Sequence, residues 1–170
     1  MIHIYCGDGK GKTTCAFGLA LRAAGRGRGV VVAQFLKTGD SGERLALQRV
    51  EGVELLPLPE RMKFTFAMDE GEKQEAVGRC LALLEGVERA LEAGKELAVL
   101  DECCAAVSTG LLPLERVTAL LDRWGGEREI VLTGRDPDPE LTGRADYITE
   151  MKKLRHPFDK GLPARLGVEW

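Results

Sequence analysis

The sequence predicts an α/β fold with a mostly parallel sheet of about six strands. Two observations support this prediction: short apolar runs alternate with longer helical stretches, and the short runs are apolar almost throughout. Strands of a parallel sheet have this character because helices cover both of its faces. In such folds ligands bind beyond the carboxyl ends of the strands, so the functional residues are sought there.

Strands are recognised as short runs rich in β-branched and other apolar residues. The runs expected to be strands are residues 2–6, 30–36, 53–58, 97–100, 129–133 and 145–149. The longest helix is expected at residues 69–93, where apolar residues recur at spacings of three and four before Gly94. The other helices are expected at residues 13–24, 41–50, 113–124 and 139–144, and residues 151–170 form a basic loop without periodicity.

Composition indicates an ordinary globular chain, and residues 1–170 are expected to form a single domain. The net charge of −3 argues against a protein built mainly to hold nucleic acid. No apolar run approaches the ~18 residues of a membrane span. A strand-like run begins at Ile2, so we expect no signal peptide. The odd cysteine count of five, without a CxxC pair, argues against a disulfide or zinc framework. We therefore expect buried thiols and a cytoplasmic location.

The strongest functional signal is a glycine-rich segment between the first strand and the first helix. It reads Gly7-Asp8-Gly9-Lys10-Gly11-Lys12-Thr13-Thr14. Glycines let backbone N–H groups converge on a phosphate, lysine adds a point charge, and a threonine hydroxyl can ligate Mg²⁺. The N-terminus of the following helix adds a partial positive charge. The segment predicts a phosphate-binding loop, and a glycine-rich turn with chance lysines is the plainer alternative.

This loop departs from the usual spacing. The first glycine normally stands five residues before the last one, a position that Cys6 occupies, whereas here the first glycine is Gly7. The loop is therefore one residue shorter, and the nucleotide is expected to bind in an unusual orientation.

A second signal is the carboxylate pair Asp101 and Glu102, directly after the apolar run at residues 97–100. In phosphate-loop proteins an acidic residue here holds Mg²⁺, directly or through water. Alone, the pair would be interpreted as solvated carboxylates, but beside the loop a metal role is favoured. The chain has only two histidines, His3 and His156, and no evident Ser-His-Asp or Cys-His arrangement.

Together these motifs resemble the ATP:corrinoid adenosyltransferase family, in particular its cobalamin-biosynthetic members. The resemblance runs from end to end of the chain, with the segments in the same order. Besides the loop, the matching segments are residues 21–25, 32–37, 64–66, 99–102, 132–135, 149–152, 156–158 and 167–169.

The resemblance implies a three-layer phosphate-loop fold of the RecA-like type and a specific reaction. The Co(I) of a reduced corrinoid attacks the 5′-carbon of ATP and releases triphosphate, for which no protein base is needed. In this family ATP lies reversed, which fits the shortened loop. The resemblance also implies Mg²⁺ or Mn²⁺ as cofactor, a reduced flavoprotein as electron donor, and a homodimer.

Residue roles follow from the same resemblance. The metal ligands implied are Thr13 and Glu102, with Asp101 supporting them from behind. Lys12 is implied to be catalytic as well as ATP-binding. The full set of implied ATP-binding residues is Gly7, Asp8, Gly9, Lys10, Gly11, Lys12, Thr13, Thr14, Arg22 and Arg135.

Phe64 and Phe66 match two aromatics that press on the lower face of the corrin ring in this family. Their implied role, both corrinoid-binding and catalytic, is to expel the lower ligand so that Co(II) is reduced more easily. On spacing alone, the hydrophobic face of a strand is the plainer interpretation.

Two other functions stay open from the residues. One is a small phosphate-loop ATPase or kinase, which would form ADP or phosphate without a corrinoid. The other is a non-catalytic, ATP-gated corrinoid carrier, which would form no cobalt–carbon bond.

Overall fold

The computed structural model describes residues 1–39, 41–60, 63 and 65–168. Its strands are β1 (Ile2–Cys6), β2 (Val30–Gln34), β3 (Val53–Leu55), β4 (Leu97–Asp101), β5 (Glu129–Thr133) and β6 (Tyr147–Glu150). Its helices are α1 (Lys12–Ala24), α2 (Gly42–Leu47), α3 (Glu70–Glu92), α4 (Cys103–Ser108), α5 (Leu114–Trp124) and α6 (Pro139–Thr142), with short 3₁₀ turns η1 (Thr65–Ala67) and η2 (Pro157–Lys160).

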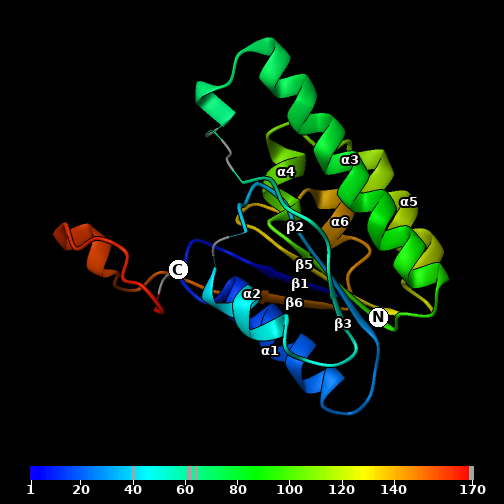
Figure 1. Cartoon of the computed structure of the whole chain (residues 1–170). Coiled ribbons are helices and arrows are strands. Elements are labelled where there is room, and N and C mark those ends of the chain that lie inside the picture. The colour runs from blue at the N-terminus through cyan, green and yellow to red at the C-terminus, as the bar shows by residue number, and fades with distance from the viewer. Residues whose placement is uncertain (40, 61–62, 64, 169–170) are drawn as a thin grey trace.

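All six strands pair in parallel, in the order β3-β2-β4-β5-β1-β6. Helices α1 and α2 cover one face of the sheet and α3 to α6 cover the other, which gives three layers (Figure 1). The predicted α/β fold with a parallel sheet is confirmed. Strand β5 lies between β1 and β4, so the segments that follow these three strands meet at one edge of the sheet.

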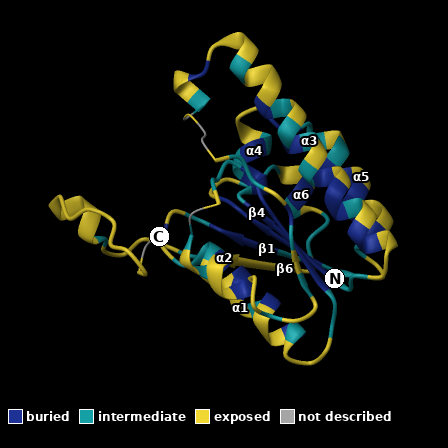
Figure 2. Cartoon of the chain, viewed as in Figure 1, coloured by how far each residue is buried: buried dark blue, intermediate teal, exposed yellow. Residues whose placement is uncertain are grey.

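The two faces of the sheet bury separate apolar clusters. Every residue of β2 and β4 is buried, as expected for strands covered on both sides. The face under α1 packs against Phe17, and the opposite face packs against Leu84 and Leu91 of α3. Strand β6 forms one edge and is exposed along its length (Figure 2).

The predicted long helix is present as α3, within one residue of the expected bounds at each end. Asp69 caps it: the Asp69 side chain accepts a hydrogen bond from the N–H of Glu72, and the Glu72 side chain accepts one from the N–H of Asp69. This reciprocal pair satisfies two donors that the helix itself leaves open. Ahead of α3, the chain around η1 projects at the top of Figure 1.

Four expectations from the sequence are corrected. Strand β2 ends at Gln34, two residues early, because Leu36 turns the chain with a positive φ of 54°. Strand β3 ends at Leu55, ahead of a proline that cannot donate to a strand ladder. Helix α4 was not expected. Phe66 lies in the 3₁₀ turn η1, so the interpretation of this segment as a strand face is wrong for residues 65–67.

The cysteines are free, and four of the five are buried, as expected. Cys15 is the exception, because it lies on the exposed side of α1. Among the described residues, no helix has the length and apolar character that crossing a membrane requires.

Candidate active site

A cavity of about 650 Å³ opens at the carboxyl edge of the sheet. The segments that follow β1, β2, β4 and β5 line one side of it, and the C-terminal tail (residues 151–168) lines the other. The residues it shares with the predicted site are Asp8, Gly9, Lys10, Gly11, Lys12, Thr13, Thr14, Glu102 and Arg135. The fold thus brings most of the predicted ATP-binding residues to one place.

The phosphate loop follows a path that requires glycine. Gly11 forms the N-terminal boundary of α1 with a φ of 118°, a backbone conformation that costs glycine little. At Gly9 an added Cβ would lie 2.6 Å from the carbonyl oxygen of Met151. The N–H of Gly9 donates to that same oxygen at 2.6 Å. The loop is therefore pressed against the chain that leaves β6.

These contacts refine the roles of Gly7 and Gly9. The Gly7 N–H donates to Arg135 O at 3.1 Å, and the Gly9 N–H is held by Met151. Neither group points its hydrogen at the cavity in this structure. The first N–H groups of α1 have no partner within the helix, so they can donate to an anion. Gly7 and Gly9 therefore contribute close packing, and the helix end contributes donors for an anion.

Lys12 lies across its own loop. Its Nζ donates to the carbonyl oxygens of Gly7, at 2.7 Å, and Gly9, at 2.8 Å. Both bonds are to neutral acceptors, so the positive charge is not neutralised by them. A phosphate oxygen at the N-terminus of α1 would offer this ammonium a charged acceptor, which makes a stronger hydrogen bond.

Asp101 organises the interior of the site, where it is fully buried at the end of β4. Its Oδ1 accepts hydrogen bonds from the hydroxyls of Thr13, at 2.9 Å, and Thr133, at 2.8 Å. Its Oδ2 accepts from Lys37 Nζ at 2.7 Å and from Gln34 Nε2 at 3.3 Å. Four donors from three segments of the chain therefore converge on one carboxylate, which fits the supporting role predicted for Asp101.

Glu102 sits at a sharp turn between β4 and α4. Its φ is 59°, a left-handed conformation that is uncommon outside glycine, and its N–H donates to Thr133 Oγ1 at 2.9 Å. Burial, followed by the nearby charge of Asp101, raises the pKa of the Glu102 carboxyl. The turn directs Glu102 to the cavity lining, while Asp101 stays behind it.

Asp8 lines the cavity, and its carboxylate accepts a hydrogen bond from the tail. Its Oδ1 accepts a hydrogen bond from the N–H of Lys153 at 2.8 Å, and this bond lowers the pKa of the Asp8 carboxyl. Together with the bond from Gly9 to Met151, it fastens the phosphate loop to residues 151–153.

Two predicted residues, Arg22 and Phe66, do not line the cavity. Arg22 is in the last turn of α1, ten residues beyond Lys12, and is not brought to the cavity. Phe66 is 87% exposed in η1 and does not line the cavity either. Phe64 lies outside the described residues.

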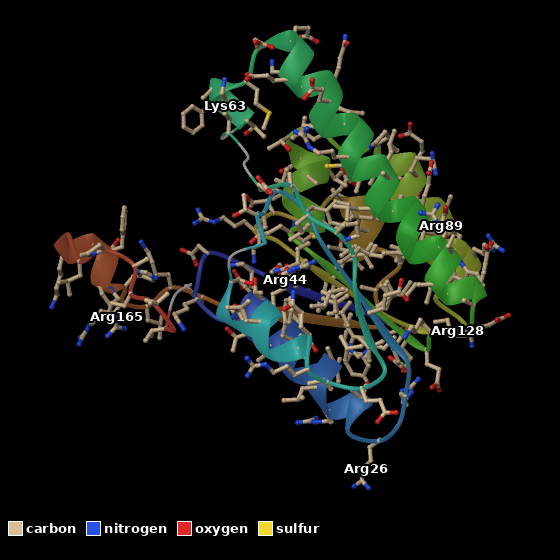
Figure 3. All side chains as sticks on the ribbon, viewed as in Figure 1. Arg26, Arg44, Lys63, Arg89, Arg128 and Arg165 are labelled. Carbon is tan, nitrogen blue, oxygen red and sulfur yellow. The ribbon has the colours of Figure 1, made fainter. Side chains whose placement is uncertain are left out.

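Sequence analysis assigns no role to two residues that the structure places here, Gln34 and Lys37. Gln34 is buried at the end of β2, and it also faces the buried Arg44 of α2, whose Nη1 lies 3.4 Å from Gln34 Oε1. Figure 3 shows Arg44 between α2 and the sheet, while Lys63 and Arg165 lie at the two projecting segments. The signal in the sequence is a polar residue at the end of an otherwise apolar strand, followed by a lysine.

The oxygen donors of the site suit a hard divalent cation. The Thr13 hydroxyl donates a hydrogen bond to Asp101 and accepts one from Lys37, so its oxygen keeps one further lone pair for a ligand, and Glu102 supplies a carboxylate. Over residues 1–39, 41–60, 63 and 65–168, no cluster of three or more His, Cys, Asp or Glu is arranged to hold a metal. Mg²⁺ commonly binds through few protein ligands together with substrate phosphates, so these residues fit it.

Comparison with known proteins shows which family the chain resembles over its whole length. A family model described as ATP:corrinoid adenosyltransferase BtuR/CobO/CobP matches residues 1–170. The corrinoid adenosyltransferase CobA of Salmonella typhimurium is 34% identical over 172 residues, which cover 100% of this chain and 85% of the relative. Corrinoid adenosyltransferases of Escherichia coli K12 and Pseudomonas aeruginosa are 33% and 32% identical over the whole of this chain and over 85% and 83% of their own lengths.

A solved structure shares the fold alone. It contains ATPases 2 and 3 of EssC from Geobacillus thermodenitrificans, with a TM-score of 0.52 and 17% identity. The likeness covers 99% of this chain but only 36% of that one. The full-length match to the family model and the identity to its curated relatives are decisive: the chain belongs to the ATP:corrinoid adenosyltransferase family.

Proposed function

We propose that this corrinoid adenosyltransferase transfers the 5′-deoxyadenosyl group of ATP to the Co(I) of a reduced corrinoid. The electron pair of Co(I) forms the cobalt–carbon bond, the bond from C5′ to the triphosphate oxygen breaks, and its electron pair leaves with triphosphate. The observation that supports this most is that the short phosphate loop, Glu102, Arg135 and the tail line the same cavity. Triphosphate held there would be a leaving group rather than a phosphoryl donor.

The residues of the loop would stabilise the departing triphosphate. Lys12 would exchange its neutral carbonyl acceptors for phosphate oxygens, and the N-terminus of α1 would add its partial charge. Lys10, Thr14 and Arg135 line the same cavity and are proposed as further phosphate contacts. Arg22 lies in the last turn of α1 and does not line this cavity, so a contact between Arg22 and the nucleotide would require ATP to extend beyond the cavity.

Thr13 and Glu102 would hold Mg²⁺ or Mn²⁺, with Asp101 fixing the Thr13 hydroxyl. When bound, the cation would neutralise charge on the triphosphate and favour its departure. Asp101 keeps the Thr13 proton away from the metal side of the oxygen, and Thr133 keeps Asp101 in place.

Phe64 and Phe66 are proposed to meet the lower face of the corrin ring. Phe66 supports this because a phenylalanine that is 87% exposed is available to a large planar ligand. We further propose a single domain, a homodimer, a reduced flavoprotein as electron donor and a cytoplasmic location. These four points rest on the resemblance and on composition.

An anaerobic absorbance assay with ATP, Mg²⁺ and Co(I) cobalamin tests the proposal. Adenosylated corrinoid should form together with triphosphate, one for one. ADP or phosphate released without corrinoid would indicate an ATPase or kinase. Bound corrinoid without an alkylcobalt product in a single turnover would indicate a carrier.

A further inference from the structure

Lys37 belongs to the segment that follows β2. Its ammonium donates hydrogen bonds to Asp101 Oδ2 and Thr13 Oγ1, two oxygens at the proposed metal site. Lys37 Nζ is 2.7 Å from Asp101 Oδ2 and 3.1 Å from Thr13 Oγ1. Asp101 is fully buried, whereas the Lys37 side chain is 28% exposed. The Lys37 side chain is therefore partly in contact with solvent, so its ammonium can move away from Asp101 without a rearrangement of the buried core.

The directions of the hydrogen bonds show that Lys37 occupies a lone pair of the Thr13 hydroxyl oxygen. Thr13 donates its proton to Asp101 Oδ1, so the Thr13 oxygen presents only lone pairs to other groups. Lys37 donates to this oxygen and thereby takes one of the lone pairs. The ammonium also neutralises the one carboxylate that lies behind Thr13.

A divalent cation on Thr13 conflicts with this arrangement. Bonds from Mg²⁺ to oxygen are about 2.0–2.1 Å long, so a cation on Thr13 Oγ1 would lie at most about 5.2 Å from Lys37 Nζ. Positive charges at that separation repel strongly, and the charge of Asp101 is already neutralised. The other cavity lysine with defined partners, Lys12, points to loop carbonyls instead.

We propose that Lys37 is a positioning residue that makes metal binding depend on nucleotide. Without nucleotide, the Lys37 ammonium occupies the place beside Thr13 and Asp101 that the metal ion would take. When ATP binds, its triphosphate supplies negative charge for both the ammonium and the metal ion, and the ammonium moves away from Thr13. Lys37 lines the cavity and can then turn to the phosphates. The inference rests on the proposed function, because it takes Thr13 and Glu102 as metal ligands.

Binding of Mn²⁺ to the chain tests this with and without ATP. It is measured by the electron paramagnetic resonance signal of the free ion, and a protein-free control corrects for the Mn²⁺ that ATP itself binds. The wild-type chain should bind Mn²⁺ weakly alone and tightly with ATP. Lys37→Gln removes the charge but keeps a donor for Asp101. It should bind Mn²⁺ without ATP at least about tenfold more tightly than the wild type. Lys37→Met should do the same, and thermal unfolding will show which of the two variants is folded.

Three matched variants locate the effect. Lys37→Arg keeps the charge and should behave as the wild type. Lys73→Met removes one charge from the exposed surface of α3, outside the cavity lining, and should leave the affinity for Mn²⁺ alone unchanged. Adding Thr13→Val to Lys37→Gln should abolish the gained affinity.

The outcomes separate the two proposals. If the wild type fails to bind Mn²⁺ even with ATP, the metal site of the proposed function is wrong. If Mn²⁺ binds normally with ATP but the folded Lys37 variants gain no affinity without it, the inference about Lys37 is overturned. A gain that survives Thr13→Val would overturn it as well.

Discussion

Replacing Gly9 with alanine tests whether the shape of the phosphate loop depends on its contact with the tail. The new Cβ would lie 2.6 Å from Met151 O, 2.8 Å from Met151 C and 3.0 Å from Lys152 C. All three are backbone atoms, so no side chain can rotate away to make room. The loop and residues 151–152 must separate, and the hydrogen bond from Gly9 N to Met151 O is lost with that movement.

The expected cost follows from these two effects. Overpacking of this kind costs about 1–3 kcal/mol, and a lost hydrogen bond adds about 1 kcal/mol. A loss of about 2–4 kcal/mol lowers the Tm of a chain of this size by roughly 5–15 °C. Because the displaced loop carries the anion site, ATP affinity should fall by at least about tenfold, which is about 1.4 kcal/mol.

The matched control is Gly18→Ala, in the middle of α1. An added Cβ there meets nothing within 4 Å. Alanine is favoured over glycine within a helix by about 1 kcal/mol, so Gly18→Ala should raise the Tm by a few degrees and leave ATP binding unchanged. Thermal unfolding and calorimetric titration with ATP measure both variants. A Gly9→Ala protein with wild-type Tm and wild-type ATP affinity would refute the reasoning.

Four further predictions address the site and the thiols. Lys12→Ala should lower ATP affinity at least about tenfold in calorimetric titration, because the ammonium opposite the triphosphate is lost, and unchanged turnover would count against the loop assignment. Phe66→Ala should slow the reaction that starts from Co(II) more than the reaction supplied with Co(I), and an equal loss in both would contradict a role at the lower face of the corrin ring. Because the pKa of Asp8 is lowered from its ordinary 3.8, the bond from Lys153 to Asp8 adds stability above that pH and loses it as the pH falls through the lowered pKa. Limited proteolysis of the tail should therefore increase in acid for the wild type, and should already be high at neutral pH for Asp8→Asn. A thiol reagent at pH 8 should modify one cysteine of the native chain and all five after unfolding, because burial raises the pKa of Cys80 to about 11 and of Cys104 to about 12, and Cys15→Ser should remove the native reaction.

The sequence predicts most of the sheet because its signals are local. Each buried strand is a run of apolar residues, and α3 carries both its capping pair and its apolar spacing within the segment itself. The ends of elements depend on contacts that the sequence does not reveal. Strand β2 stops where Leu36 takes a positive φ, although Leu36 is apolar like the strand before it. Helix α4 has only six residues, which is too few for periodicity to be recognised.

In the site, too, features that are local in sequence are predictable and contacts between distant segments are not. The loop and the carboxylate pair at residues 101–102 are predictable because each is contiguous in sequence. The partners of Asp101 come from three segments that are distant from it in sequence, so no spacing reveals Gln34 or Lys37 as members of the group. Likewise, Asp8 stands within the motif and is expected to contact phosphate, whereas its carboxylate accepts a hydrogen bond from the backbone N–H of Lys153, 145 residues away.

The attachment of the phosphate loop to residues 151–153 has a consequence for synthesis of the chain. Residues 7–9 leave the ribosome early, but the backbone groups that fix their positions are made some 145 residues later. Chains are made from the N-terminus, and contacts this distant in sequence form late in folding. ATP therefore cannot stabilise a partly made chain through this loop. Nucleotide affinity will appear only when β6 has paired with β1 and the tail has closed over the loop, so nucleotide binding reports completion of the fold.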